Sequence, residues 1–144
     1  MGRLRTQLND RLEAAASVEH QSNRLRIGIS PHAPYSVEPD GLRACADRGR
    51  RMNSPLCIHL AETAEEATFT QSRSGRFTEF LQEIGIWDED IPTSGCTPVE
   101  LCRETGVLDR RTIVAHGNYV GDADIAIIAE NGSSVAYCPR THHA

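Results

Sequence analysis

The sequence predicts an α/β fold with a parallel sheet, and three features of the chain lead to this prediction. Four short apolar runs alternate with segments of helical periodicity along the 144 residues. No two of these runs are arranged as neighbouring strands of a hairpin. A histidine stands at or shortly after the end of three of the runs. Alternation of this kind implies parallel strands joined by right-handed crossovers, either in an open α/β sheet or in part of a barrel.

Two helices and two strands are predicted in the first sixty residues. Residues 5–19 carry apolar side chains at helical spacing with charges between them, which indicates an amphipathic helix. Residues 25–29 have the alternation of a strand, and Pro31 ends it. Pro39 suits the first turn of the second helix. The apolar run at residues 55–59 is predicted to be the second strand.

The second strand is predicted to lead directly into a helix, because Thr63 and Glu66 have the spacing of a capping box. A further apolar stripe, from Phe77 to Ile84, indicates another helix. A second capping box, with a proline directly behind its first residue, starts at Thr97. The remaining predicted elements are a third strand at residues 112–116, a helix at 122–130 and a fourth strand at 134–138.

The composition excludes several classes of protein. A formal net charge of -5 and an isoelectric point near 5.6 argue against a nucleic-acid-binding protein, which normally carries a basic patch. The apolar runs are far shorter than the roughly 20 residues that span a bilayer, and no signal-peptide pattern opens the chain. The five cysteines contain no CxxC pair and are interpreted as reduced structural thiols. We therefore expect a cytoplasmic protein that binds neither nucleic acid nor membranes.

Histidines stand at the ends of three predicted strands, as His32, His59 and His116. In a parallel α/β array the carboxyl ends of the strands lie on one face, and that face carries the chemistry. A single histidine at a strand end is commonly a structural residue, but three on successive strands favour one shared pocket. Glu62 lies three residues after His59 and would serve to move protons beside a metal that an imidazole holds. The same carboxylate also suits the positive end of the following helix, and both roles are compatible.

Four motifs stand out in the chain. They are Pro-His-Ala-Pro-Tyr-Ser at residues 31–36, His-Leu-Ala-Glu-Thr at 59–63, Ala-His-Gly at 115–117 and Cys-Pro-Arg-Thr at 138–141. In this order and at these separations they resemble the amidohydrolase superfamily. The similarity is strongest to its deaminase branch, which includes adenosine, methylthioadenosine and S-adenosylhomocysteine, guanine and aminofutalosine deaminases and related chlorohydrolases.

The resemblance implies a (β/α)8 barrel of the TIM type with one catalytic zinc or iron. Residues 1–144 would be a partial barrel of about four parallel βα units, at barrel strands four to seven. On that basis His59 is the metal ligand, and Glu62 is the acid and base that transfers a proton from the attacking water to the leaving amine. His116 would orient the attacking hydroxide, and His32 would contact the substrate.

Two metal-binding features of that family are missing from the sequence. No His-x-His pair occurs anywhere, and the chain stops before the strand that carries the family's metal-binding aspartate. Thr141 and His142 also stand where the family often has serine and asparagine, which affects the substrate preference. We therefore expect a fragment that keeps one of four metal ligands and holds no metal stably on its own.

The expected function is that of part of a metal-dependent aminohydrolase. In complete form it would hydrolyse a C–N bond and deaminate an aminopurine-like or nucleoside-derived small molecule, whereas this chain alone would be inactive. One alternative is a chlorohydrolase-like or other C–N hydrolase of the same superfamily, which would expel a different group. Another is a non-catalytic half-barrel module that pairs with another chain, and a homo-oligomer is compatible with all three.

Overall fold

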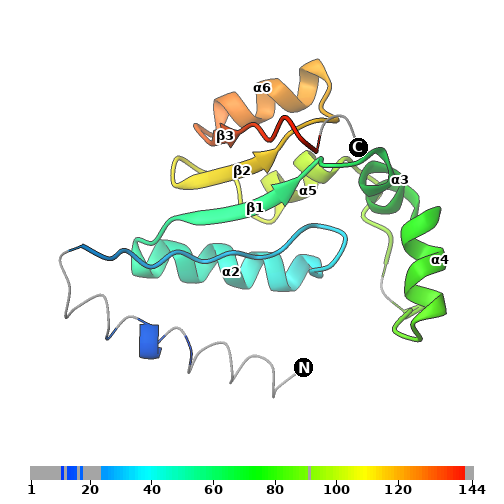
Figure 1. Ribbon diagram of the computed structural model, residues 1–144, viewed down its shortest axis with the longest axis horizontal. Helices are drawn as coiled ribbons and strands as arrows, with labels where there is room; N and C mark the ends of the chain where they lie inside the picture. Colours follow the sequence, from blue (N-terminus) through cyan, green and yellow to red (C-terminus); the bar gives the residue numbers. More distant parts are fainter. Residues whose placement is uncertain (1–10, 12, 16, 18–23, 91, 142–144) are drawn as a thin grey trace.

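A three-stranded parallel sheet lies at the centre of the computed structural model, which describes residues 11, 13–15, 17, 24–90 and 92–141. The strands are β1 (Leu56–Leu60), β2 (Thr112–His116) and β3 (Ser134–Ala136), in the spatial order β1-β2-β3 (Figure 1). The helices are α2 (Pro39–Met52), α3 (Ala64–Ser72), α4 (Arg76–Glu83), α5 (Pro98–Glu104) and α6 (Asp122–Glu130). Most of the helix predicted at residues 5–19 lies outside the described residues.

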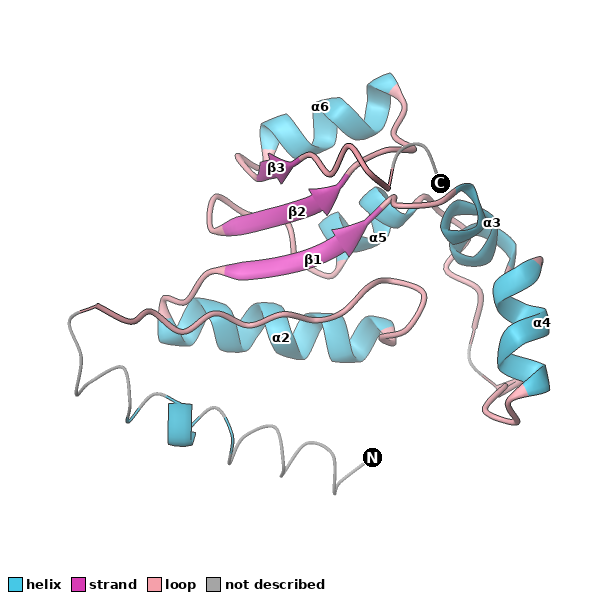
Figure 2. Ribbon diagram, viewed as in Figure 1, coloured by secondary structure: helices cyan, strands magenta, loops and turns pink. Residues whose placement is uncertain are grey.

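The order of helices and strands confirms the predicted α/β class. Figure 2 shows α2 alongside β1, α6 alongside β3, and α3 and α4 beyond the carboxyl end of β1. The capping box predicted at Thr97 is confirmed, because the Thr97 hydroxyl accepts from the Glu100 amide at 3.1 Å and the Glu100 carboxylate accepts from the Thr97 amide at 2.8 Å. Within the described part of the chain, every helix is too short or too polar to cross a lipid bilayer.

The first predicted strand, at residues 25–29, is wrong as a full strand. Ile29 forms a single parallel bridge with Leu56, and its amide donates to Pro55 O at 2.9 Å. Pro31 has no N–H for a ladder, and no described segment pairs with the outer edge of this stretch. The sheet therefore has three strands instead of four. The last strand ends at Ala136 instead of residue 138, since its partner β2 pairs no further than Ala115.

One face of the sheet is buried and the other is open. In β1 and β2 the side chains are buried at alternate positions, while Cys57 and Ile113 between them are exposed. Cys57 is therefore an exposed thiol. The buried core joins the sheet to α2, α5 and α6 and consists of Leu42, Ala46, Ile58, Leu60, Val99, Leu101, Cys102, Val107, Leu108, Val114, Ile127 and Ile128.

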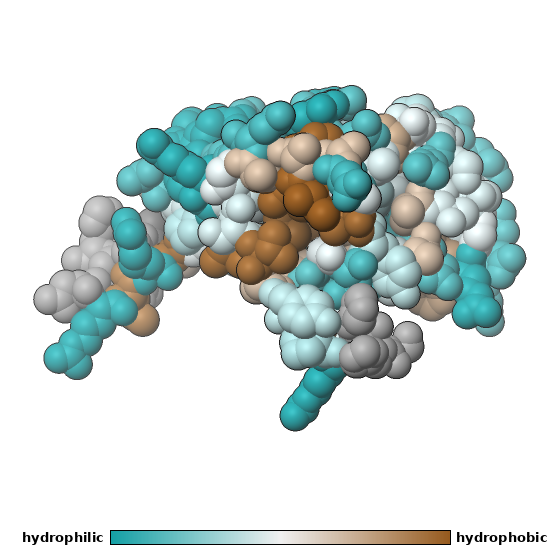
Figure 3. All heavy atoms as spheres, turned by 90° about the horizontal axis from the view of Figure 1, so that it is seen from above, coloured by the Kyte–Doolittle hydropathy of each residue, from teal (hydrophilic) through white to brown (hydrophobic). Residues whose placement is uncertain are grey.

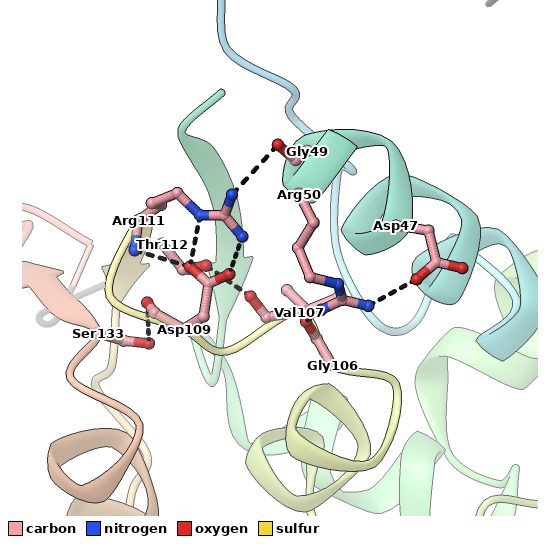
Figure 4. Close-up of polar contacts among 9 residues, drawn as sticks. All are labelled: Asp47, Gly49, Arg50, Gly106, Val107, Asp109, Arg111, Thr112 and Ser133. Carbon is pink, nitrogen blue, oxygen red and sulfur yellow. Dashed lines mark hydrogen bonds and ion pairs between the residues drawn. The ribbon is translucent and has the colours of Figure 1, made fainter. Parts of the chain in front are cut away.

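Two arginines link α2 to the segment that enters β2, at the end of the sheet opposite the strand-end histidines (Figure 4). Arg111 donates to the Asp109 carboxylate and to Gly49 O, and Arg50 donates to Gly106 O at 3.0 Å. Burial raises the pKa of Asp109, but the hydrogen bonds from the Arg111 side chain and amide outweigh it and hold that pKa below its ordinary value. The ionised form of Asp109 therefore stabilises the folded chain.

Replacing Asp109 by asparagine is expected to lower the free energy of unfolding by about 1–2 kcal/mol at pH 7, since one charge-assisted bond from Arg111 is lost. A lowered pKa in the folded state gives stability that is present above the unfolded pKa and disappears as pH falls through the folded pKa. Urea unfolding at pH 7 and pH 3 should therefore show a difference that shrinks in acid. Asp40→Asn, which breaks an exposed pair with Arg43, is the control and should change stability by less than about 0.5 kcal/mol.

Candidate functional site

His59, Glu62 and His116 come together at the carboxyl ends of β1 and β2. The parallel register places Leu60 opposite His116, so both strands end at the same edge. His59 Nδ1 lies 2.9 Å from His116 Nε2, which lies 3.5 Å from Glu62 Oε1. One potential ligand atom from each of the three lies within 4.8 Å of the others. The structure thus brings together His59, Glu62 and His116, three of the four site residues that the sequence predicts.

Both strands end in a left-handed backbone conformation. Ala61 has a φ of 52° and His116 a φ of 79°, in a region of backbone conformation that residues other than glycine rarely adopt. Strict alternation along β2 would point His116 to the same face as buried Val114, away from the face that carries His59. The turn at His116 ends that alternation. The Ala61 carbonyl, which accepts from the amides of Asn118 and Tyr119 at 2.9 and 3.0 Å, ties the two strand ends together.

His32 lies beside these three residues but is not one of the grouped potential metal ligands. Its ring packs edge-on against His59 with the centroids 5.5 Å apart, and His59 N donates to His32 O at 3.0 Å. The Nδ1 atom of His32 is 2.6 Å from the hydroxyl of Ser36. The His32 side chain is exposed.

Glu66 holds the turn that carries Glu62, a role that the sequence analysis missed. Its amide donates to the Thr63 hydroxyl at 3.3 Å, as a capping box requires. Its carboxyl group does not return to the Thr63 amide but accepts from the amides of Ala61 and Glu62, both at 3.0 Å. Glu66 is fully buried. Burial raises its pKa to about 7 against the opposing effect of the two amide bonds, with a smaller upward contribution from the charge of Glu62.

The stability of the chain should therefore depend on the protonation of Glu66. A pKa raised from 4.5 to about 7 means that the folded chain binds this proton more tightly than the unfolded chain. The resulting stability is complete below pH 4.5 and is lost as pH rises through 7, which amounts to about 3 kcal/mol. Urea unfolding of the native chain and of Glu66→Gln across this range should show the native chain losing stability relative to the variant. Parallel curves would contradict the assignment, and the exposed Glu79→Gln is the control.

Thr141 and Asn118 complete the surroundings of the site. Thr141 Oγ1 lies 2.9 Å from His116 Nδ1, and Asn118 Nδ2 donates to the carbonyl oxygen of Glu62 at 3.2 Å. The side-chain oxygen of Asn118 is buried and has no hydrogen-bond donor among the described residues. The sequence pointed to both residues by their positions: Asn118 directly follows the His-Gly pair, and Thr141 is the last residue of the Cys-Pro-Arg-Thr motif.

The three converging side chains fit a metal ion. Imidazole nitrogens and carboxylate oxygens are the donors that zinc takes in catalytic sites, where three protein ligands suffice. With a lone pair on Nε2, His116 would present an acceptor 3.5 Å from Glu62 Oε1, and a cation bound by both atoms would stabilise this arrangement. The structure thus offers three donors, where the resemblance assigns one ligand.

A cavity of about 320 Å³ lies next to the site between the loop at residues 34–39, α3 and α4. Tyr35 and Ser36 line it, whereas His59, Glu62 and His116 do not. The Tyr35 ring stacks on Phe77 with the centroids 4.3 Å apart. Burial raises the pKa of the Tyr35 hydroxyl, and the charges of Glu62 and Glu66 add to this effect.

Comparison with known proteins gives a consistent match. Residues 3–144 match the model of the amidohydrolase family. A 5'-deoxyadenosine deaminase of Methanoregula boonei is 31% identical over 122 residues, which cover 85% of this chain and 23% of that protein. A 5-methylthioadenosine/S-adenosylhomocysteine deaminase of Pyrococcus abyssi is 30% identical over 121 residues, covering 84% and 24%. This chain thus spans about a quarter of the length of these relatives.

A solved structure shows the same fold. The adenosine deaminase from Xanthomonas campestris with bound zinc aligns with a TM-score of 0.63 at 22% identity, over 89% of this chain and 25% of that one. At this level of identity the likeness concerns the arrangement of the strands and helices and not the substrate.

Proposed function

Because this chain belongs to the amidohydrolase family, we propose that it forms part of the (β/α)8 barrel of a metal-dependent aminohydrolase. The observation that carries the proposal is the convergence of His59, Glu62 and His116 at the carboxyl ends of two parallel strands. That end of a barrel is where catalytic residues gather. Both relatives named above deaminate adenine nucleosides by name, which supports an aminopurine-like or nucleoside-derived substrate.

Each residue has a distinct part in such a reaction. His59 would hold the metal, zinc or iron, which when bound supplies a Lewis acid that makes water a better nucleophile near neutral pH. Glu62 would take a proton from the attacking water and return a proton to the departing amine, which leaves as ammonia. His116 would orient the water through Nε2. His32, exposed beside His59, would contact the substrate.

The open face of the sheet supports the proposal that these residues are one part of a larger barrel. Ile113 on β2 is 42% exposed, and its partner Cys57 on β1 is exposed on the same face, although a barrel strand buries both faces. Figure 3 shows apolar residues gathered in a patch on one side of the molecule. We infer that further strands cover the open face, and that residues 1–144 alone neither bind metal stably nor deaminate.

The test is to read the coding sequence on both sides of this chain and to assay the complete polypeptide. We expect an upstream His-x-His pair, a downstream strand-end aspartate, and ammonia release from 5'-deoxyadenosine, methylthioadenosine or guanine that a chelator abolishes. Residues 1–144 assayed alone should release none. Ammonia release by the short chain would contradict its incompleteness. Chloride release from a chlorinated triazine, in place of ammonia, would favour the chlorohydrolase alternative.

The open sheet face is also compatible with the alternative of a non-catalytic half-barrel that pairs with another chain. A non-catalytic module that completes its barrel with a second chain would bury Cys57 and Ile113, which share the open face, in the contact. Light scattering of residues 1–144 distinguishes the two, since a well-folded monomer would rule out pairing between copies of this chain.

A further inference from the structure

The contacts of Thr141 point to a function for its hydroxyl group. We propose that Thr141 is a positioning residue that fixes His116 in the tautomer with the proton on Nδ1, leaving a free lone pair on Nε2. The tautomer itself follows from hydrogen bonds on this chain. Its value for catalysis rests on the proposed function, because only there does Nε2 act on water or on a metal.

The first step is the count of hydrogens around the Thr141 oxygen. A hydroxyl group has one hydrogen to donate, and a carbonyl oxygen can only accept. Thr141 Oγ1 lies 2.9 Å from the carbonyl oxygen of Cys138 and donates to it. The side-chain nitrogen Nδ2 of Asn118, 3.5 Å away, is a donor directed at the same hydroxyl. With its hydrogen directed at Cys138 O, the Thr141 hydroxyl accepts from Nδ1 of His116 at 2.9 Å.

The second step concerns the other nitrogen of the ring. His116 is 6% exposed, so water does not compete for its nitrogens as it would at the surface. With the proton on Nδ1, the lone pair of Nε2 faces His59 Nδ1 at 2.9 Å and Glu62 Oε1 at 3.5 Å. With the proton on Nε2, this atom could neither bind a metal nor accept a hydrogen bond from water. The partner of one imidazole nitrogen thus decides what the other can do.

The opposite arrangement is the competing hypothesis. If the Thr141 hydroxyl turned to donate to His116 Nδ1, Cys138 O would keep only the backbone amide of Thr141, at 3.1 Å. His116 would then carry its proton on Nε2 and donate it towards Glu62 or His59. The two arrangements share the same heavy-atom positions but differ in the tautomer, which is measurable.

The experiment is ¹⁵N NMR of the histidine rings in the labelled, metal-free chain at about pH 8, where an ordinary imidazole is neutral. Long-range ¹H–¹⁵N spectra identify which nitrogen of His116 carries the proton. The native chain and Thr141→Ser, which keeps the hydroxyl, should show the proton on Nδ1. Thr141→Val, which keeps the shape and removes the acceptor, should lower the ratio of the Nδ1-H to the Nε2-H form by about tenfold, as expected for one lost hydrogen bond.

A native ring protonated on Nε2, or the same ratio in the native chain and Thr141→Val, would overturn the inference. If the valine variant does not fold, the native tautomer alone still decides. Zinc binding by the complete polypeptide gives a second readout, expected to weaken about 10- to 100-fold in Thr141→Val and to recover in Thr141→Ser. If Nδ1 carries the proton but the complete polypeptide has no deaminase activity, the inference about the tautomer stands and the proposed function is contradicted. Failure of the inference and failure of the proposed function are therefore distinguishable.

Discussion

Replacing Glu62 by glutamine should lower the kcat of the complete enzyme by about 10²- to 10⁴-fold, the range that a positioned general acid and base contributes. Glutamine keeps the shape of the side chain but cannot accept a proton from water and deliver one to the departing amine. The hydrogen bond that the backbone N–H of Glu62 donates to the Glu66 carboxyl group does not involve the Glu62 side chain and survives the change. The measurement is ammonia release at saturating substrate, with KM determined in the same series.

The zinc content of the Glu62→Gln variant shows whether Glu62 transfers protons or binds the metal. The carboxylate lies among the three possible metal donors, so a loss of activity alone does not distinguish the two roles. We expect Glu62→Gln to keep its zinc by elemental analysis while losing its turnover. A variant that loses zinc and turnover in equal measure would make Glu62 a ligand and not the proton carrier. Glu79→Gln, an exposed carboxylate on α4, should leave both unchanged.

Replacing His59 by alanine should weaken zinc binding to the complete polypeptide by more than about 100-fold. This exceeds the 10- to 100-fold cost of losing a residue that only supports a ligand, because His59 is proposed to be a ligand itself. Competition against a zinc-binding dye measures the affinity without any assay of activity. The ring is half-buried at the strand end, so the effect on folding should be small beside the effect on metal.

His32→Gln is the matched control for that experiment. His32 touches the His59 ring, but its Nδ1 is engaged with Ser36 and it is not one of the three converging donors. Zinc affinity should stay within about twofold of the native value, while KM for the substrate rises. A fall in zinc affinity equal to that of His59→Ala would place His32 among the ligands and contradict the assignment of the two histidines.

The positions of His59 and His116 in the chain were predictable, because each follows an apolar strand with clear limits. The first strand was not, since the alternation at residues 25–29 is real but Pro31 and the lack of a second partner reduce it to one bridge at Ile29. Sequence patterns report the tendency of a segment to be extended. Whether it pairs depends on neighbours that are distant in the chain.

The sequence by itself determined the α/β class, the order of the elements and the family to which the motifs pointed, because these follow from local periodicity and residue type. Only the tertiary structure placed Glu66 under the Ala61 and Glu62 amides and Thr141 against His116. At both strand ends, Ala61 and His116 adopt left-handed backbone conformations, which end the side-chain alternation that the sequence would predict. The sequence therefore identifies the candidate metal-binding residues, whereas the backbone at the edge of the sheet decides how their side chains meet.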